Sequence, residues 1–330
     1  MKLSKKLNSV NNKTILITGA TGSLGQSLIK FLIPRGCTII AYSRDEGKHA
    51  LLFKHDNIVS VIGDVRDYTK LCTTIKVHKP DYIIHAAALK RIDDMEIYPD
   101  ECIKTNIQGS DNVARAALQH DVERCILIST DKACLPVNVY GSSKFIAERL
   151  FTNYDYTSTS TIFSSVRYGN VIASRGSFIP LFIENMTNDI PINVTSDEMT
   201  RFLFTLEDAV ITVINALVNA VGGEVFIPQI NSYTLPAVIS AIEAIINKKA
   251  ETTITGLRPG EKLHEDMLAI TELPFTYQVD DINLLQIRPQ YTKKQFQDFK
   301  KYSGPHFNSA LWKQDDCLAL QQIIKDGLVM

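Results

Sequence analysis

The sequence lacks any uninterrupted apolar run of the ~20 residues that a membrane-spanning helix requires. Its N-terminal stretch, MKLSKKLNSVNNK, is basic, but no apolar segment follows it as one would in a secretory signal. We therefore expect a chain without a membrane segment that works in the cytoplasm.

Cysteine is sparse, and no two cysteines form a CxxC pair. Scattered cysteines are typical of proteins in reducing compartments, where most of them are small buried apolar residues. We expect neither disulfides nor a metal site. The six cysteines are Cys37, Cys72, Cys102, Cys125, Cys134 and Cys317.

An excess of charge of one sign is also missing, because 35 Lys and Arg residues face 36 Asp and Glu residues. This balance argues against nucleic acid as the main ligand, although a local basic pocket for a phosphorylated small molecule remains compatible with it. An apolar fraction of 45% in 330 residues is ordinary for a globular protein with a sizeable core.

The first half of the chain alternates short apolar runs with segments of helical spacing. Near-continuous apolar strands separated by helices indicate a parallel sheet that is covered on both faces. We predict a Rossmann-type, doubly wound α/β fold, with an N-terminal extension (1–12), a dinucleotide-binding domain (13–170) and a smaller, mainly substrate-binding region (171–330). The predicted strands are Lys13–Thr18, Cys37–Tyr42, Ile58–Ile62, Asp81–His85, Cys125–Thr130 and Thr161–Arg167.

After residue 170 the pattern changes. Ser174–Pro180 has the composition of a loop, and Val225–Pro228 is one of several short strand-like pieces. One more strand of this region could return to the main sheet. The last forty residues carry no readable pattern. Helices are predicted at Phe178–Met186, Leu206–Val221 and Leu235–Asn247.

A glycine-rich turn follows the first predicted strand, in the segment TGATGSLG at 18–25. Its glycines allow a sharp turn, a close approach to a pyrophosphate and tight packing of the next helix, whose N-terminus would face the phosphates. The alternative is a purely structural turn. The residues predicted to bind the cofactor here are Gly19, Thr21, Gly22, Ser23, Leu24 and Gly25.

The second predicted strand ends next to Arg44 and Asp45. An acidic residue at this point would bind the ribose hydroxyl of NAD, whereas a guanidinium suits the 2′-phosphate of NADP, so Arg44 favours NADP. The alternative is a solvated surface pair of Arg44 and Asp45. Asp64 follows the third strand, where it could accept a hydrogen bond from the adenine amino group. Val65, Ala86 and Ala87 complete the predicted cofactor site.

Tyr140 and Lys144 lie four residues apart in a predicted helix, which places them on one face. A neighbouring ammonium would lower the pKa of Tyr140 and make its phenol a usable base. The alternative is an ordinary surface pair on a helix.

Thr130, Asp131 and Lys132 end the fifth predicted strand, at the edge where open α/β sheets bind their ligands. A hydroxyl, a carboxylate and an amine beside a Tyr/Lys pair exceed what alcohol oxidation needs, and they suit an elimination. The alternative is a strand-end turn in which Asp131 caps a helix.

Together these motifs resemble the extended short-chain dehydrogenases/reductases, and within them the UDP-N-acetylglucosamine 4,6-dehydratases that invert C5. The resemblance covers about residues 13–270, and Asp131-Lys132 followed by Tyr140-Gly-Ser-Ser-Lys144 is its most specific part. The dTDP-glucose 4,6-dehydratases carry Asp-Glu there, and the membrane-anchored retaining relatives usually have Met in place of Tyr140. The matching segments are TGATGSLG (18–25), YSRDE (42–46), HAAALK (85–90), KTNIQGSDNV (104–113), STDKACLPVNVYGSSK (129–144), RYGNVIASRGSFIP (167–180), MTRFLFTLEDAV (199–210) and GLRPGEKLHE (256–265).

The resemblance implies a role for each site residue. Thr130, Tyr140 and Lys144 would serve hydride transfer, Asp131 would be the acid of the elimination, and Lys132 would be its base, neutralised by crowding near Lys144. Two arginines could clamp the UDP phosphates, the alternative being structural ion pairs. The residues implied to line the sugar nucleotide are Lys90, Asn170, Arg201, Arg258 and Glu261.

The implied reaction forms UDP-2-acetamido-2,6-dideoxy-β-L-arabino-hex-4-ulose from UDP-N-acetylglucosamine, as the first step of a deoxyamino-sugar nucleotide pathway. The implied enzyme is a hydro-lyase that uses NADP and forms a homo-oligomer, a dimer or a hexamer. Two alternatives stay open: a UDP-sugar 4-epimerase on the same scaffold and a non-catalytic NADP-binding protein.

Overall fold

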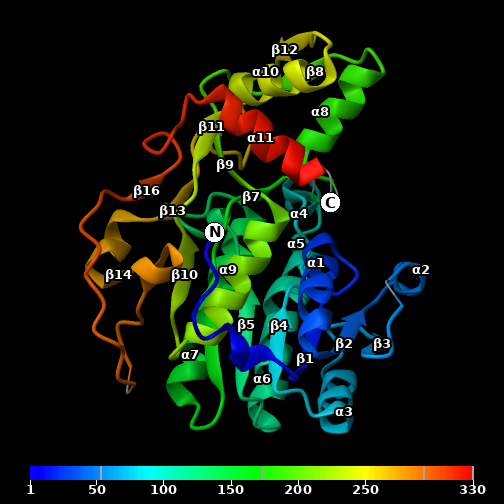
Figure 1. The fold of residues 1–330 in the computed structure, drawn as a ribbon, viewed down its shortest axis with the longest axis vertical. Helices are drawn as coiled ribbons and strands as arrows, with labels where there is room; N and C mark the ends of the chain where they lie inside the picture. The colour runs from blue at the N-terminus through cyan, green and yellow to red at the C-terminus, as the bar shows by residue number, and fades with distance from the viewer. Residues whose placement is uncertain (53, 173, 175, 293, 329–330) are drawn as a thin grey trace.

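A nine-stranded sheet forms the centre of the computed structural model, which describes residues 1–52, 54–172, 174, 176–292 and 294–328 (Figure 1). Its strand order is β14-β15-β10-β6-β5-β4-β1-β2-β3. All neighbours from β3 to β10 are parallel, whereas β15 and β14 extend the sheet in antiparallel fashion. The predicted Rossmann-type architecture is therefore confirmed. The strands are β1 (Thr14–Thr18), β2 (Thr38–Ser43), β3 (Ile58–Ile62), β4 (Tyr82–His85), β5 (Arg124–Ile128), β6 (Ile162–Val166), β10 (Val225–Pro228), β14 (Thr276–Val279) and β15 (Leu284–Ile287).

Helices cover both faces of this sheet. In β1, Ile15 and Ile17 pack into the cluster under α1 and α9, while Leu16 points to the opposite cluster with α3, α6 and α7. This alternation follows from the two-residue period of a strand and explains why β1 is apolar almost throughout. The helices of the sheet-containing part of the molecule are α1 (Ser23–Leu32), α2 (Glu46–Ala50), α3 (Tyr68–His78), α4 (Ile92–Ile97), α5 (Pro99–Cys102), the π-helix η3 (Ile103–Gln108), α6 (Gly109–Gln119), α7 (Val139–Thr157) and α9 (Leu206–Asn219).

The second half of the chain forms a smaller layer above the carboxyl ends of the central strands, at the top of Figure 1. Three helices share one buried apolar cluster there: α8 (Phe178–Thr187), α10 (Leu235–Ile246) and α11 (Cys317–Leu328). Short strands of the second half form three small sheets: β7 (Asn170–Val171), β8 (Ile192–Val194), β9 (Thr200–Phe204), β11 (Ser232–Thr234), β12 (Thr252–Ile254), β13 (Asp266–Leu268) and β16 (Phe307–Asn308). The 3₁₀ helices of the described residues are η1 (Leu7–Val10), η2 (Ile33–Arg35), η4 (Asp131–Ala133), η5 (Ile270–Phe275) and η6 (Asp280–Ile282).

The second half also enters the main sheet. One returning strand was expected, whereas three strands of this half, β10, β15 and β14, join the sheet. The boundary at residue 170 stays a prediction. Helix α9 and three strands from beyond that residue pack in the core of the first domain. Within the loop predicted at Ser174–Pro180, α8 begins at Phe178, and Arg175 lies outside the described residues. No helix in the described part of the chain is long and apolar enough to cross a membrane.

Candidate active site

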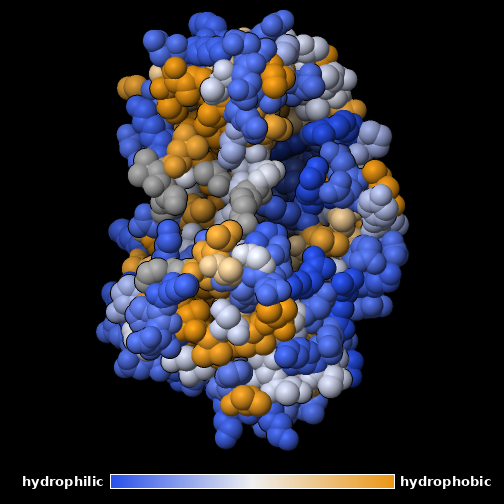
Figure 2. Space-filling model, turned by 90° about the vertical axis from the view of Figure 1, so that its right-hand side faces the viewer, coloured by the Kyte–Doolittle hydropathy of each residue, from blue (hydrophilic) through white to orange (hydrophobic). Residues whose placement is uncertain are grey.

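A cavity of about 1120 Å³ opens where the sheet meets the smaller layer. Figure 2 shows the face on which it lies, with a recess whose walls are mostly hydrophilic. The volume slightly exceeds the roughly 300–1,000 Å³ typical of ligand pockets, so it can hold an extended ligand or two ligands side by side. Every residue predicted for the site lines this cavity except Arg201.

The glycine-rich turn brings main chain against main chain at the cavity wall. Gly19 has a φ of +71°, and a Cβ there would lie 2.8 Å from the amide nitrogen of Ala87. A Cβ at Gly25 would lie 2.5 Å from the carbonyl oxygen of Ala20, so the start of α1 is packed tightly against the turn. Gly22 stands at the N-cap of α1, whose N-terminus carries the partial positive charge of the helix dipole. These residues fit the pyrophosphate of a dinucleotide.

Just after the carboxyl end of β2, Arg44 and Asp45 contact different residues. Asp45 caps α2 by accepting from the Lys48 backbone nitrogen at 3.0 Å, and its other oxygen pairs with Lys48 Nζ at 2.8 Å. Arg44 Nη1 instead lies 3.7 Å from Asp64 Oδ2, and half of its side chain is exposed. Arg44 therefore pairs with Asp64 rather than forming the surface pair with Asp45. Lys48, for which no role was predicted, also lines the cavity.

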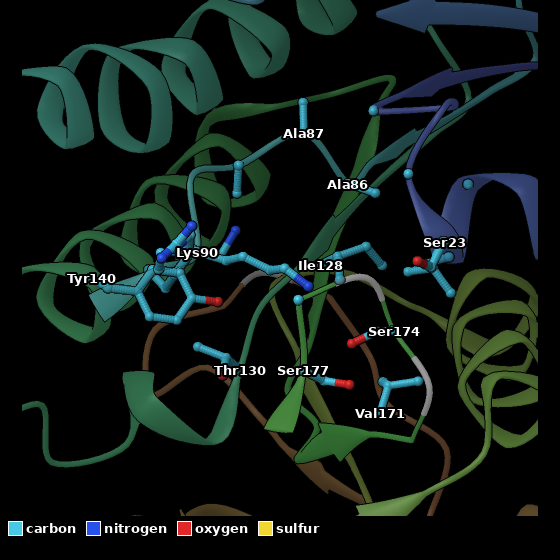
Figure 3. A pocket seen from close by; sticks show the side chains of 18 of the residues that line it. Ser23, Ala86, Ala87, Lys90, Ile128, Thr130, Tyr140, Val171, Ser174 and Ser177 are labelled. Carbon is cyan, nitrogen blue, oxygen red and sulfur yellow. The ribbon is translucent and has the colours of Figure 1, made fainter. Parts of the chain in front are cut away.

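The two predicted catalytic segments meet in the cavity. Thr130 and Asp131 follow β5, and Tyr140 lies in the first turn of α7, which Asn138 caps by accepting from the Gly141 backbone nitrogen at 2.7 Å. Thr130 Oγ1 donates to Asp131 Oδ1 at 2.8 Å. In Figure 3 the phenol oxygen of Tyr140 points into the cavity near Lys90, with Thr130 below it and Ser23 at the opposite end.

The charges around Tyr140 differ from the prediction. Burial raises the pKa of its phenol to about 12, although the charge of Lys132 and a hydrogen bond with Thr130 act in the opposite direction. Burial also lowers the pKa of Lys144 to about 8. The charge that lowers the pKa of Tyr140 in the structure is that of Lys132, whereas the sequence predicted Lys144 in this role.

Lys132 is held between two carboxylates. Its Nζ lies 3.0 Å from Asp131 Oδ1 and 3.2 Å from Glu265 Oε1. Burial alone would lower the pKa of Lys132, but these two negative charges outweigh it and raise the pKa above its ordinary value. The predicted neutral Lys132 is therefore not what these contacts favour, because a second carboxylate, Glu265, also lies against its ammonium.

Four of the residues predicted to line a sugar nucleotide also line the cavity: Lys90, Asn170, Arg258 and Glu261. Asn170 Oδ1 is buried and has no hydrogen-bond partner among the described residues, so a ligand donor would satisfy it. Arg258 is exposed and pairs with Asp93 at 3.2 Å and with Glu261 at 3.4 Å. An exposed pair of this kind contributes little to stability, so its guanidinium remains available to an anion.

Arg201 is placed differently. Its guanidinium donates to the carbonyl oxygens of Thr200, Lys262 and Leu263 at 2.8–3.2 Å, and it does not line the cavity. Arg201 thus holds the loop of the GLRPGEKLHE motif onto β9. It also lies 3.6 Å from Glu261 and 4.0 Å from Glu265, as in the structural ion pair considered as the alternative.

Several residues that shape the site had no predicted role. Asn106, in the π-helix η3, binds both the nitrogen and the oxygen of Leu89 at 2.8 and 2.9 Å and so fixes the loop that carries Lys90. Lys262 Nζ donates to the carbonyl oxygen of Cys134 at 2.7 Å, and Asn138 Nδ2 donates to that of Gly260 at 2.8 Å. The segments 131–138 and 260–265 are therefore fastened together. Their motifs were recognised separately, but nothing in either indicated this contact.

Comparisons with known proteins agree with this geometry. Residues 15–286 match the family described as polysaccharide biosynthesis protein. Over 281 residues the chain is 41% identical to a Campylobacter jejuni protein named UDP-N-acetylglucosamine 4,6-dehydratase (inverting), with 82% of each chain covered. Over 272 residues it is 38% identical to a Rickettsia bellii protein named UDP-glucose 4-epimerase, with 79% of each covered. The X-ray structure of Pen from Bacillus thuringiensis superposes with a TM-score of 0.89 at 30% identity, over 97% of this chain and 99% of that one.

Proposed function

The chain belongs to the polysaccharide biosynthesis protein family, and from this premise we propose that it is a UDP-N-acetylglucosamine 4,6-dehydratase that inverts C5. The observation that carries the proposal is the contact of Asp131 with Lys132 beside Thr130 and Tyr140 in one cavity. The relative of that name, 41% identical, supports the same reaction.

The contact between Asp131 and Lys132 suggests how an acid and a base could arise together. Transfer of one proton from Lys132 Nζ to Asp131 Oδ1, across 3.0 Å, turns an ammonium and a carboxylate into an amine and a carboxylic acid. The amine can then remove the C5 proton, and the acid can protonate the departing C6 hydroxyl, which leaves as water. Asp131 Oδ2 is buried without a hydrogen-bond partner in the described part of the chain, which leaves it open to the substrate.

Tyr140 is the proposed base for the sugar 4-hydroxyl, and loss of the C4 hydrogen there makes the neighbouring C5 proton acidic. When bound, an oxidised nicotinamide would accept the hydride from C4, return it to C6 and place a positive charge in the site. Lys132 and Thr130 already act to lower the pKa of Tyr140 from the side of β5. Lys144, one turn further along α7, is placed to hold the cofactor ribose.

The proposed cofactor is NADP. Arg44 and Lys48 both line the cavity at the end of β2, and Asp45 is turned toward α2 by its cap and its ion pair. Two cations that line the cavity at this point favour a 2′-phosphate over a 2′-hydroxyl.

A test of this preference is Arg44→Ala, which should weaken binding of NADP by about 1.5–3 kcal/mol and change binding of NAD little, because only the phosphate loses a charge-assisted partner. Titration of the protein with each cofactor measures both affinities. Arg66→Ala is the matched control: Arg66 pairs with Asp64 at 2.7 Å but lies outside the cavity lining, so it should affect both cofactors alike. Tighter binding of NAD than of NADP by the unmodified protein would refute the assignment.

A second candidate is a UDP-sugar 4-epimerase, favoured by the 38% identical relative of that activity. An epimerase needs Tyr140 and the cofactor but no acid and base at C5 and C6. Mass spectrometry of UDP-N-acetylglucosamine after incubation separates the candidates. We expect a product lighter by one water. If the mass is unchanged, proton NMR of the sugar separates an altered C4 configuration, which would establish the epimerase, from unchanged substrate, which would favour a non-catalytic protein.

A further inference from the structure

Glu265 is a buried carboxylate in the site that none of the roles above includes. Its side chain is 3% exposed, and its Oε1 lies 3.2 Å from Lys132 Nζ. Glu265 itself does not line the cavity, whereas Lys132 does. Glu265 therefore contacts Lys132 from behind, on the side turned away from the ligand space.

The backbone of Glu265 is fixed from both sides. Its nitrogen donates to Ser309 Oγ at 2.8 Å, and its carbonyl oxygen accepts from the Ser309 nitrogen at 2.8 Å. Ser309 Oγ is in turn 2.6 Å from Thr200 Oγ1. A flexible surface acid could not hold a lysine in one position, but a carboxylate on an anchored backbone can.

The free oxygen of Glu265 separates this contact from a simple structural ion pair. Oε2 is buried, and no hydrogen-bond partner for it exists among the residues described. Two cations lie near Oε1: Lys132 and, at 4.0 Å, Arg201 Nε. The terminal nitrogens of Arg201 donate mainly to backbone carbonyl oxygens. A purely structural ion pair would be expected to satisfy both carboxylate oxygens, because each unsatisfied buried acceptor destabilises the fold.

We propose that Glu265 is a positioning residue for the elimination step, which holds the Lys132 amine in line between Asp131 and the C5 proton of the substrate. This inference rests on the proposed dehydratase function. Glu265 gives Lys132 a second anchor on the C-terminal segment, so that Lys132 keeps its place after its proton has moved to Asp131. Without that anchor only the flexible lysine side chain would direct the amine.

The proposal is tested with Glu265→Gln, which keeps the size of the side chain and removes its charge. We expect kcat for water loss to fall at least tenfold and KM for UDP-N-acetylglucosamine to stay within about threefold, because Glu265 lies outside the cavity wall. In a single turnover, the 4-keto sugar that still carries its C6 hydroxyl should accumulate, since Glu265→Gln leaves both Tyr140, the base for oxidation at C4, and the Lys132 cation that acts on it in place. Glu265→Asp retains the charge and should fall between the wild type and Glu265→Gln.

Glu198→Gln is the matched control, since Glu198 is an exposed acid in the same part of the molecule; it should behave as the wild type. Loss of water by the wild-type protein is the separate test of the proposed function, so failure there and failure of the Glu265 proposal are distinguishable. Three results would overturn the positioning role: an unchanged kcat in Glu265→Gln, a change confined to KM, or an equal slowing of oxidation and elimination that Glu265→Asp does not relieve.

Discussion

Replacing Tyr140 with phenylalanine should lower turnover by about 10²–10⁴-fold, the range that a positioned general base contributes. The ring of Phe would still pack at the start of α7, but the sugar 4-hydroxyl would have no group to take its proton. Binding of the UDP-sugar should change little, because the proposed nucleotide contacts come from other elements, among them the loop that carries Arg258 and Glu261. Calorimetric titration and steady-state kinetics separate these two effects.

Tyr154→Phe on the same helix is the control for this substitution. Its hydroxyl donates to Asp111 at 2.6 Å and lies outside the cavity lining, so activity should be unaffected. If Tyr140→Phe turned over at a rate comparable to the wild type, Tyr140 could not be the base.

The sequence predicted those helices and strands that a local pattern of residues determines. The six apolar runs of the first half became parallel strands, because β1 and its neighbours are buried on both faces and tolerate few polar residues. The antiparallel strands β14 and β15 and the helix α11 were not predicted. Contacts with distant segments fix β15, which pairs with β10, and α11, which packs on α10 although residues 247–316 separate the two helices.

In the candidate site, too, residues related by local spacing were predicted, and contacts between distant segments were not. Spacing within one helix or turn identified Tyr140, Lys144 and the glycines, because local geometry alone brings those residues together. The charge state of Lys132 was misjudged because one of its two carboxylates, Glu265, is 133 residues away in the sequence and 3.2 Å away in space. Arg201 was predicted to line the sugar nucleotide but does not line the cavity. The sequence shows that an arginine is charged, but it does not show which backbone carbonyl oxygens the guanidinium will contact in the fold.

Lys132→Ala should stop the reaction after oxidation at C4. The 4-keto sugar should form in a single turnover and should not lose water, because no amine remains to remove the C5 proton. Lys132→Arg is the informative companion: it keeps a cation between Asp131 and Glu265, but a guanidinium does not give up its proton, so it should stall at the same point. Mass spectrometry of the sugar nucleotide distinguishes the keto sugar from the dehydrated product.

The competing mechanism gives Asp131 both proton transfers. It predicts that Lys132→Ala still dehydrates the sugar at a reduced rate, so a decrease of less than about tenfold would count against Lys132 as the base.

Reaction of the wild-type protein in D₂O tests the same step without a substitution. Inversion requires that the proton leave C5 on one face and that another arrive on the opposite face, so the arriving proton cannot be the one that Lys132 removed. It must come from groups that exchange with solvent, and the product should carry deuterium at C5. A product without deuterium there would mean that the original proton was returned to the face it left, and the inverting assignment would be lost together with the role of Lys132.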